Sequence, residues 1–318
     1  MNVSVVIPLY NKCESISKTI DSVLKQSFRN FELIIVNDGS TDNSVSVVES
    51  IIKSDIQGAD KIRLINKPNG GVSSARNRGI QEAKYDYIAL IDGDDYWDKD
   101  CLKELVRMSK DFPDAGMWGV NYADVRGGKI YPYYQGFPDN FRGYVKDYFC
   151  TSHGDVFWTS ALMMRKDVVI RVGLFDERIR YSEDMDLWYR IILNAKVCFY
   201  NKVYAYYNKD AENRAEQDID KHFNIYQRWE YYIEKYNSYF ECDPEFARFV
   251  GMRVAINILS NNYYFGKEED RKATDHIVRY LPLKNMPFKY TLIFKTPRWL
   301  GKILYKCSIK IKKLKNKR

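Results

Sequence analysis

The sequence predicts an α/β fold in which a mixed, mostly parallel sheet is flanked by helices and followed by a helical C-terminal extension. Runs of β-branched and other apolar residues alternate three times with segments of helical periodicity in the first 91 residues. Such strand–helix–strand units form right-handed crossovers between parallel strands. Polar residues follow these strands, at the edge where ligands bind in open α/β sheets.

The elements of the first half follow from these runs. SVVIPL and FELIIVN are typical of buried parallel strands. Ile16, Ile20 and Leu24 recur at helical spacing, and the turn at 38–42 supplies an N-cap for the next helix. We expect strands at residues 4–9, 31–37, 62–66 and 87–91, and helices at 14–26, from 42 to about 53, and at 72–83.

The pattern loosens after a further expected helix at residues 101–110. Residues 124–143 are rich in Gly, Tyr and Pro, which predicts a hairpin or a loop. We then expect a core strand at 156–164, helices at 165–172 and 183–193, and a strand at 197–207. From about residue 218 the sequence predicts long amphipathic helices.

The length of 318 residues allows one large domain or two smaller ones. We predict an α/β domain at residues 1–215, a helical subdomain at 216–283 and a basic tail at 284–318. The tail holds 12 Lys and Arg residues and no Asp or Glu. Subtracting those 12 charges from the net +8 leaves −4 for residues 1–283. The tail is therefore a basic appendage on a mildly acidic body.

The expected cellular location follows from the signal peptide, transmembrane and cysteine patterns that the sequence lacks. The start MNVSVVIPLYN has no basic lead-in and is not typical of a signal peptide. No run of 18 apolar residues predicts a transmembrane helix. The six cysteines are scattered without C-x-x-C spacing, which makes a zinc site unexpected. We expect a cytoplasmic protein with reduced thiols.

The stretch YIALIDGDDYW is the most informative feature of the chain, because an apolar strand runs into Asp92, Asp94 and Asp95 at a turn opened by Gly93. Carboxylates crowded at the end of a buried strand repel one another unless they are hydrated, hydrogen-bonded or held by a cation. Mg²⁺ and Mn²⁺ take such oxygen ligands, usually together with substrate phosphates. The alternative is a solvated acidic turn.

Five segments taken together resemble the inverting nucleotide-sugar glycosyltransferases of family 2, which have the GT-A fold. The segments are VVIPLYN (5–11), IIVNDGSTD (34–42), NGGVSSARNRGI (69–80), IDGDDYW (91–97) and SEDMDLWYRI (182–191). The resemblance covers about the first 210 residues and implies a Rossmann-like GT-A domain whose donor is a nucleoside diphosphate sugar. The helical region after residue 218 matches no segment of the family.

For the donor site, the resemblance implies a divalent cofactor, Mn²⁺ or Mg²⁺, held by Asp92 and Asp94. Asp94 would be the direct ligand, whereas Asp92 and Gly93 would also contact the nucleotide. Asp95 has an alternative structural role, either capping the next helix or orienting its neighbours. The ion would bridge the two phosphates and stabilise the leaving diphosphate.

The resemblance also implies the nucleotide contacts. Asp38 would accept a hydrogen bond from a ring N–H of uracil or thymine, which favours UDP over GDP. Its structural alternative is closure of the turn. Arg76 would add its guanidinium near a helix N-terminus, or would tie the loop to an Asp. The remaining nucleotide-binding residues implied by the family are Pro8, Tyr10, Asn11 and Asn77.

On the acceptor side, Glu183 and Asp184 resemble the acidic pair of the family. Asp184 would be the general base that removes the proton of the attacking hydroxyl, and Glu183 would orient it or the acceptor. Acids at a helix start are also ordinary caps. Trp188 could stack on a sugar or lie in the core, and His153 could contact phosphate or acceptor or be a structural hydrogen-bond partner.

The tail predicts a membrane contact. Apolar residues recur at helical spacing beside an excess of lysine, a pattern typical of helices on anionic membranes. The apolar positions are Trp299, Leu300, Ile303, Leu304, Cys307 and Ile311. A solvated basic tail or a nucleic-acid contact is the alternative. We expect the membrane partner, no nucleic acid, and a location on the cytoplasmic face.

We therefore expect a metal-dependent inverting glycosyltransferase that moves one hexosyl or N-acetylhexosaminyl residue, from a UDP-sugar by preference. Its acceptor would be a hydroxyl of a glycan or lipid-linked acceptor in bacterial surface polysaccharide synthesis. A sugar nucleotidyltransferase is an alternative, but its Gly-rich first loop is absent here, where residues 8–11 read PLYN. The second alternative function is that of a catalytically inactive sugar-nucleotide-binding or membrane scaffold protein.

Overall fold

The computed structural model of the chain forms two compact units, Met1–Asp218 and Ile219–Arg318. Each unit is described by itself. The described residues are 1–54, 56–134, 136–151, 156–214, 225–260, 268–297 and 299–303.

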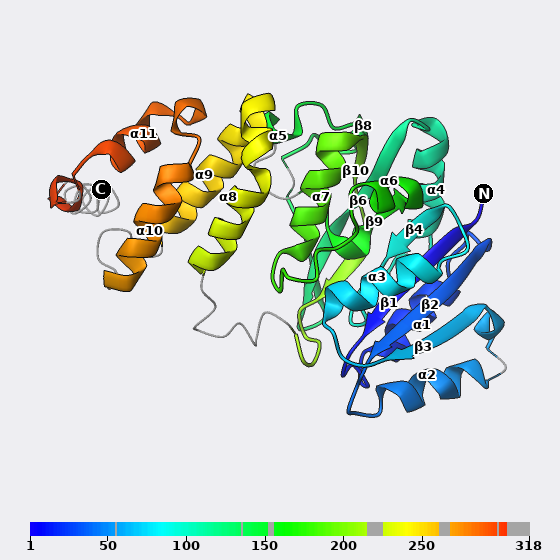
Figure 1. The fold of residues 1–318 in the computed structure, drawn as a ribbon. Helices are drawn as coiled ribbons and strands as arrows, with labels where there is room; N and C mark the ends of the chain where they lie inside the picture. The colour runs from blue at the N-terminus through cyan, green and yellow to red at the C-terminus, as the bar shows by residue number, and fades with distance from the viewer. Residues whose placement is uncertain are drawn as a thin grey trace. The chain divides into compact units, whose positions relative to one another are not determined.

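The first unit is built on a ten-stranded mixed sheet (Figure 1). Eight strands follow the order β3-β2-β1-β4-β9-β6-β10-β5, while β7 pairs with β6 and β8 with β10. The four strands from β3 to β4 run parallel, β9 is antiparallel to both β4 and β6, and β6 is parallel to β10. The strands are β1 (Val3–Leu9), β2 (Phe31–Asp38), β3 (Ile62–Lys67), β4 (Tyr87–Leu90), β5 (Tyr96–Trp97), β6 (Ala115–Arg126), β7 (Lys129–Pro132), β8 (Arg142–Tyr144), β9 (Leu162–Arg165) and β10 (Lys196–Asn208).

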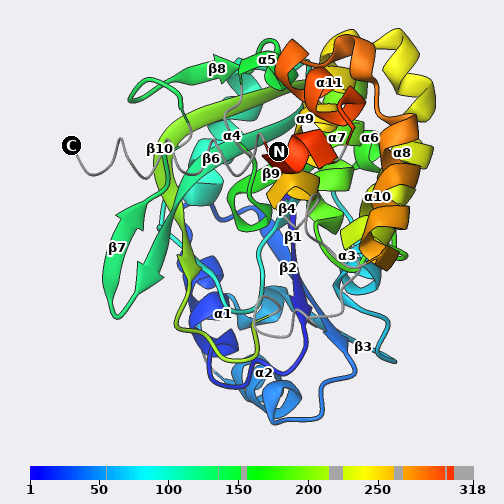
Figure 2. The ribbon, with the colours of Figure 1, turned by 90° about the vertical axis from the view of Figure 1, so that its left-hand side faces the viewer.

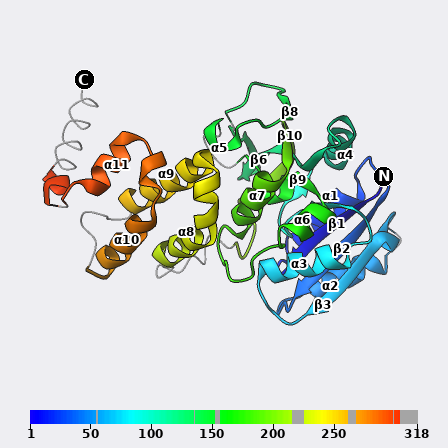
Figure 3. The ribbon, with the colours of Figure 1, turned by 45° about the horizontal axis from the view of Figure 1, so that its top comes forward.

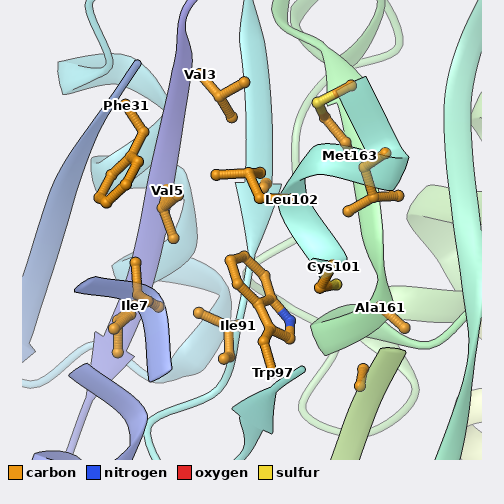
Figure 4. Close-up of a cluster of buried hydrophobic side chains, with 14 of the residues drawn as sticks. Val3, Val5, Ile7, Phe31, Ile91, Trp97, Cys101, Leu102, Ala161 and Met163 are labelled. Carbon is orange, nitrogen blue, oxygen red and sulfur yellow. The ribbon is translucent and has the colours of Figure 1, made fainter. Parts of the chain in front are cut away.

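Helices cover both faces of this sheet. Alternate residues of β1, namely Val3, Val5 and Ile7, enter a core shared with α1, α2 and α4 (Figure 4). The opposite face receives α3 (Figure 3). Gly79 of this helix lies directly against Val6. The helices are α1 (Ile16–Leu24), α2 (Ser44–Ile52), α3 (Val72–Glu82), α4 (Cys101–Asp111), α5 (Tyr148–Thr151), α6 (Lys166–Arg171) and α7 (Glu183–Asn194), with 3₁₀ turns η1 (Ala59–Lys61) and η2 (Thr159–Ala161).

The strands and helices expected up to residue 111 are confirmed, with their ends shifted by about one or two residues. The hairpin alternative for residues 124–143 is also confirmed, because β6 and β7 pair in an antiparallel hairpin before β8 (Figure 2). The long strand β6 was not predicted. Its first nine residues are all buried, so the sequence AGMWGVNYA lacks the alternation that marks a half-exposed strand.

The strand expected at residues 156–164 was wrong in its extent. Residues Thr159–Ala161 form the 3₁₀ turn η2, and the strand β9 begins at Leu162. Ser160 explains the interruption, because its hydroxyl hydrogen-bonds to the acidic turn after β4. The turn therefore brings polar groups to the carboxyl end of β4.

The second unit is helical in its described residues. Its helices are α8 (Ile225–Cys242), α9 (Pro244–Ser260), α10 (Glu268–Tyr280) and α11 (Phe288–Lys295), with a 3₁₀ turn η3 (Leu283–Asn285). Helix α8 packs against both α9 and α10, and the rings of Tyr236 and Phe246 meet edge to face at 5.2 Å. Among the described residues, no helix has the length and apolar character needed to cross a membrane.

The close approach of α3 to the sheet can be tested at Gly79. A Cβ atom there would lie 2.2 Å from Val6 Cγ1, so Gly79→Ala must shift the helix or the strand. We expect this substitution to lower the free energy of unfolding by about 1–2 kcal/mol, because overpacking outweighs the better helix propensity of Ala. Urea denaturation with an unchanged m-value measures the change.

Val6→Ala is the matched background for this test, because it removes the methyl group that a Cβ at position 79 would meet. Gly79→Ala should cost less in that background, and the difference is the coupling energy of the two positions. A Gly79→Ala protein as stable as the parent would contradict the tight packing.

Candidate functional site

The acidic turn that follows β4 is anchored by Asp95. This side chain is 1% exposed and accepts hydrogen bonds from Ser160 Oγ at 2.5 Å and from the Asn208 backbone N–H at 3.2 Å. Ser160 Oγ in turn accepts from the N–H of Asp92 at 3.0 Å. Burial, with repulsion from Asp94 and Asp92, raises the pKa of Asp95 well above its ordinary value. Asp95 thus joins three chain segments and orients its neighbours.

Asp94 is paired with a lysine that the sequence did not single out. Lys12 Nζ lies 2.6 Å from Asp94 Oδ2, and both side chains are nearly buried. The same ammonium donates to the carbonyl oxygens of Glu212 and Asn213, each at 2.8 Å. Burial raises the pKa of Asp94, since it outweighs the attraction to Lys12, and repulsion from Asp92 acts in the same direction. Lys12 therefore links the acidic turn to the segment after β10.

Arg76 of α3 lies between the two acidic pairs. Its Nη2 donates to Asp92 Oδ1 and its Nη1 to Glu183 Oε1, both at 2.7 Å. Burial alone would lower the pKa of Arg76, but attraction to Asp92 and Glu183 raises it above its ordinary value. Arg76 as a whole is 4% exposed. Its guanidinium lies over the ring of Phe175, 5.2 Å from the ring centroid. One buried cation thus connects the carboxyl end of β4 to the start of α7.

Asp184 lies beside this bridge in the first turn of α7 and is half-buried. Its Oδ2 accepts a hydrogen bond from Thr159 Oγ1 at 3.2 Å, and its Oδ1 accepts from the N–H of Met185 at 2.8 Å. The residue before the pair, Ser182, has a φ of 58° in the left-handed region, which is uncommon for a residue other than glycine. The chain turns sharply here to present Glu183 and Asp184.

Asp38 closes the loop between β3 and α3. Its Oδ1 and Oδ2 accept from the N–H groups of Gly70 and Gly71 at 2.9 and 2.8 Å, and Lys67 Nζ lies 2.5 Å from Oδ1. The carboxylate is 2% exposed. This is the turn-closing role held as the alternative, and base recognition by Asp38 stays a prediction.

Two other residues of the predicted nucleotide set also make structural contacts. Asn11, with a φ of 51°, accepts from the N–H of Thr41 at 2.8 Å. Asn77 is buried and forms a pair of 2.9 Å hydrogen bonds with the backbone N–H and C=O of Phe175. Asn77 therefore holds the phenyl ring that supports Arg76. The Asn77 amide is engaged within the protein, and a nucleotide contact at Asn77 stays a prediction.

The remaining nucleotide positions lie on the exit of β1 and on the acidic turn. Pro8 is buried in the strand, whereas Tyr10 is 42% exposed. Gly93 lies close to the Pro8 carbonyl, because a Cβ at this position would be 3.2 Å from that oxygen. The strand exit and the acidic turn are thus in contact.

Two residues, Trp188 and His153, were predicted to contact the acceptor. Trp188 is 1% exposed and packs edge to face on Phe175 at 6.0 Å, so the prediction that it stacks on a sugar is wrong and the core alternative holds. The indole ring is buried against Phe175, so a sugar cannot reach it in this structure. His153 lies outside the described residues.

Like Lys12, the segment after β10 is a part of the site that the sequence did not reveal. Glu212 Oε1 accepts hydrogen bonds from the N–H groups of Glu14 and Ser15 and from Ser15 Oγ, at 3.0 to 3.1 Å. Asn213 Nδ2 lies within 3.5 Å of the carbonyl oxygens of Tyr10 and Asn11. No familiar spacing marks these residues, and only their return to the β1 exit reveals them.

The carboxylates at this edge fit a divalent ion, though they do not form a complete cage. Within the described residues, no group of three or more His, Cys, Asp or Glu side chains could hold a metal ion. Mg²⁺ and Mn²⁺, however, are commonly held by one or two carboxylates with substrate phosphates and water. Asp92 and Asp94 are thus carboxylates of the kind that could contribute to such a shared site.

Known proteins resemble the chain in sequence and in fold. It is 29% identical over 213 residues to an uncharacterised glycosyltransferase of Rickettsia typhi. This match covers 63% of this chain and 62% of the Rickettsia protein. It is also 29% identical over 238 residues to the glycosyltransferase GlyG of Streptococcus pneumoniae serotype 4, covering 68% of this chain and 74% of GlyG. The chain thus spans a little under two thirds of the Rickettsia relative.

The fold matches a solved structure. S. aureus TarS residues 1–349 in complex with UDP-GlcNAc superimposes with a TM-score of 0.72 at 20% identity, over 90% of this chain and 83% of that one. The predicted GT-A fold class is therefore confirmed. The model of glycosyl transferase family 2 matches residues 4–173, more than half of the chain. The chain belongs to glycosyl transferase family 2.

Proposed function

We propose that this protein transfers one sugar, hexosyl or N-acetylhexosaminyl, from a nucleoside diphosphate sugar to a hydroxyl of a glycan or lipid-linked acceptor, with inversion at the anomeric carbon. A UDP-sugar is the favoured donor, because the fold neighbour TarS was solved with UDP-GlcNAc. Chondroitin synthase of Pasteurella multocida, 29% identical over 224 residues, supports a role in polysaccharide synthesis, although the match covers 22% of that protein.

The observation that carries the proposal is the Arg76 bridge. It joins Asp92, on the side proposed for the donor, to Glu183, on the side proposed for the acceptor. Asp184 is adjacent to that bridge and half-buried. A displacement reaction needs a leaving-group site and a base on opposite sides of one reacting carbon. A single guanidinium that positions both sides suits this requirement.

In the proposed reaction, an acceptor hydroxyl oxygen forms a bond to the anomeric carbon as the bond to the diphosphate oxygen breaks. The hydroxyl proton passes to a carboxylate oxygen of Asp184, which Thr159 orients through its 3.2 Å hydrogen bond. Glu183 is held by Arg76 through a hydrogen bond on the side proposed for the acceptor. Arg76 also fixes the direction in which Asp92 faces the donor.

Asp94, with Asp92, would hold a divalent ion, Mn²⁺ or Mg²⁺, which when bound supplies positive charge to the departing diphosphate. Lys12 is the positive group at Asp94 in this structure. Its ammonium must share or yield that carboxylate when the ion is present, because one carboxylate oxygen already accepts from it at 2.6 Å. Lys12 therefore sets the charge balance of the acidic turn.

Donor binding tests the proposal directly. UDP-GlcNAc with Mn²⁺ at about 100 times its Kd should stabilise the fold by about 2.7 kcal/mol, read as a rise in melting temperature. GDP- and dTDP-sugars should shift it less, and Asp94→Ala or EDTA should abolish the shift. If no nucleotide sugar stabilised the protein, the result would contradict the proposal and favour a catalytically inactive scaffold protein.

Asp184→Asn tests the base. We expect UDP release during transfer to fall by about 10²- to 10⁴-fold, because the amide cannot accept the proton, while the donor-induced thermal shift persists. Asp167→Asn, which removes one carboxylate from an exposed surface position with a 54% exposed side chain, is the matched control and should be active. Undiminished transfer by Asp184→Asn would rule out this base.

Arg76→Lys tests the bridge. Lysine keeps the charge but cannot hold two carboxylates with a planar fork, so one charge-assisted hydrogen bond is lost. We expect kcat/KM to fall by about a hundredfold, equivalent to about 2.7 kcal/mol. Arg78→Lys, two residues away and paired with Glu82 at the surface, should behave like the parent. Equal activity of both variants would contradict a positioning role for Arg76.

A further inference from the structure

The C-terminal end of the second unit exposes large apolar side chains. Phe288, Leu292, Trp299 and Ile303 are 76%, 52%, 65% and 53% exposed. We call these four residues the apolar C-terminal face. Most helices of soluble proteins turn charged or polar residues to solvent and apolar ones to the core, so this exposure requires an explanation.

Helix α11 shows that the exposure is one-sided. Phe288 and Leu292 are four residues apart and share a face of the helix. Tyr290, on the other side of the helix, is 9% exposed, so the helix already has a packed face. The apolar C-terminal face is therefore additional to the surface that the unit needs for its own core.

The same part of the chain carries exposed positive charge. Lys284 and Lys295 are exposed in the described part of the chain, and Lys295 lies seven residues from Phe288 on the same face of α11. In the sequence, residues 284–318 carry 12 Lys and Arg and no acidic residue. Charge of one sign beside exposed Trp, Phe, Leu and Ile is the composition of a surface that inserts among anionic lipids.

We propose that the apolar C-terminal face inserts into an anionic lipid surface, with the exposed Lys284 and Lys295 contacting the headgroups. The aliphatic members distinguish this partner from a nucleic acid, because phosphates attract the lysines but offer Leu292 and Ile303 no apolar environment. The eight-residue helix α11 lies at the interface rather than across the bilayer. The inference goes beyond glycosyl transfer and does not depend on it.

Vesicle cosedimentation of the full chain tests the proposal. The protein should bind vesicles of phosphatidylcholine with phosphatidylglycerol much more tightly than phosphatidylcholine alone, and added salt should weaken binding. Leu292→Asn with Trp299→Asn should reduce binding to anionic vesicles by at least about tenfold, since burial of either side chain is lost. Ile256→Asn, at a 48% exposed position of α9, is the matched control and should bind normally.

The charge contribution is tested separately by Lys284→Gln and Lys295→Gln, each expected to weaken binding by about fivefold. Trp299→Phe provides a second readout: quenching of tryptophan fluorescence by bromine-labelled lipids should be larger in the parent than in this variant. The circular dichroism spectrum and the donor-induced thermal shift should be unchanged in every variant, which separates this proposal from the proposed function.

Three results would overturn the inference. One is equal binding of the double apolar variant and the Ile256→Asn control. Another is equal quenching of the parent and of Trp299→Phe. The third is tight binding of duplex DNA that survives the apolar substitutions, without binding to anionic vesicles, which would assign the basic segment to nucleic acid.

Discussion

The buried guanidinium of Arg76 is the interaction on which the candidate site depends. Asp92 and Glu183 come from distant parts of the chain, and each is held by one 2.7 Å hydrogen bond from this group. Removing one partner of a buried ion pair costs about 3–5 kcal/mol, because the remaining charge is left uncompensated. Asn77 and Trp188 support the arrangement indirectly, through the backbone and the ring of Phe175. Two residues expected to touch ligands are thus part of the support for Arg76.

The second constraint is the concentration of carboxylates at one edge of the sheet. Asp95 accepts hydrogen bonds from Ser160 and the Asn208 amide, and Asp94 is paired with Lys12, yet burial and mutual repulsion still raise the pKa of both acids. Such crowding persists where a cation or a charged substrate completes the balance. Lys12 and the segment at Glu212 and Asn213 bring the end of β10 back to the exit of β1. The same contacts that balance the charge therefore enclose the acidic turn.

The two units of the chain differ in how they bury apolar side chains. In the first, helices on both faces bury a mixed sheet, and polar groups collect where its strands end. In the second, α8, α9 and α10 pack together, while the apolar C-terminal face is left to solvent in the described residues. Exposed apolar side chains beside positive charge suit an interaction surface rather than a core. The proposed transfer site and the proposed lipid contact thus lie in different units of the chain.

The sequence by itself determined the fold class and, except for the two-residue strand β5, the strand–helix order to residue 111. Buried strands and amphipathic helices have periods that are visible without a structure. It also located the acidic turn, Arg76 and the Glu183–Asp184 pair. Tertiary structure alone decided that Trp188 and Asn77 face Phe175, that β6 is a long buried strand, and that Lys12 pairs with Asp94. These contacts join residues far apart in the chain, and local pattern carries no information about which distant side chain fills a given space.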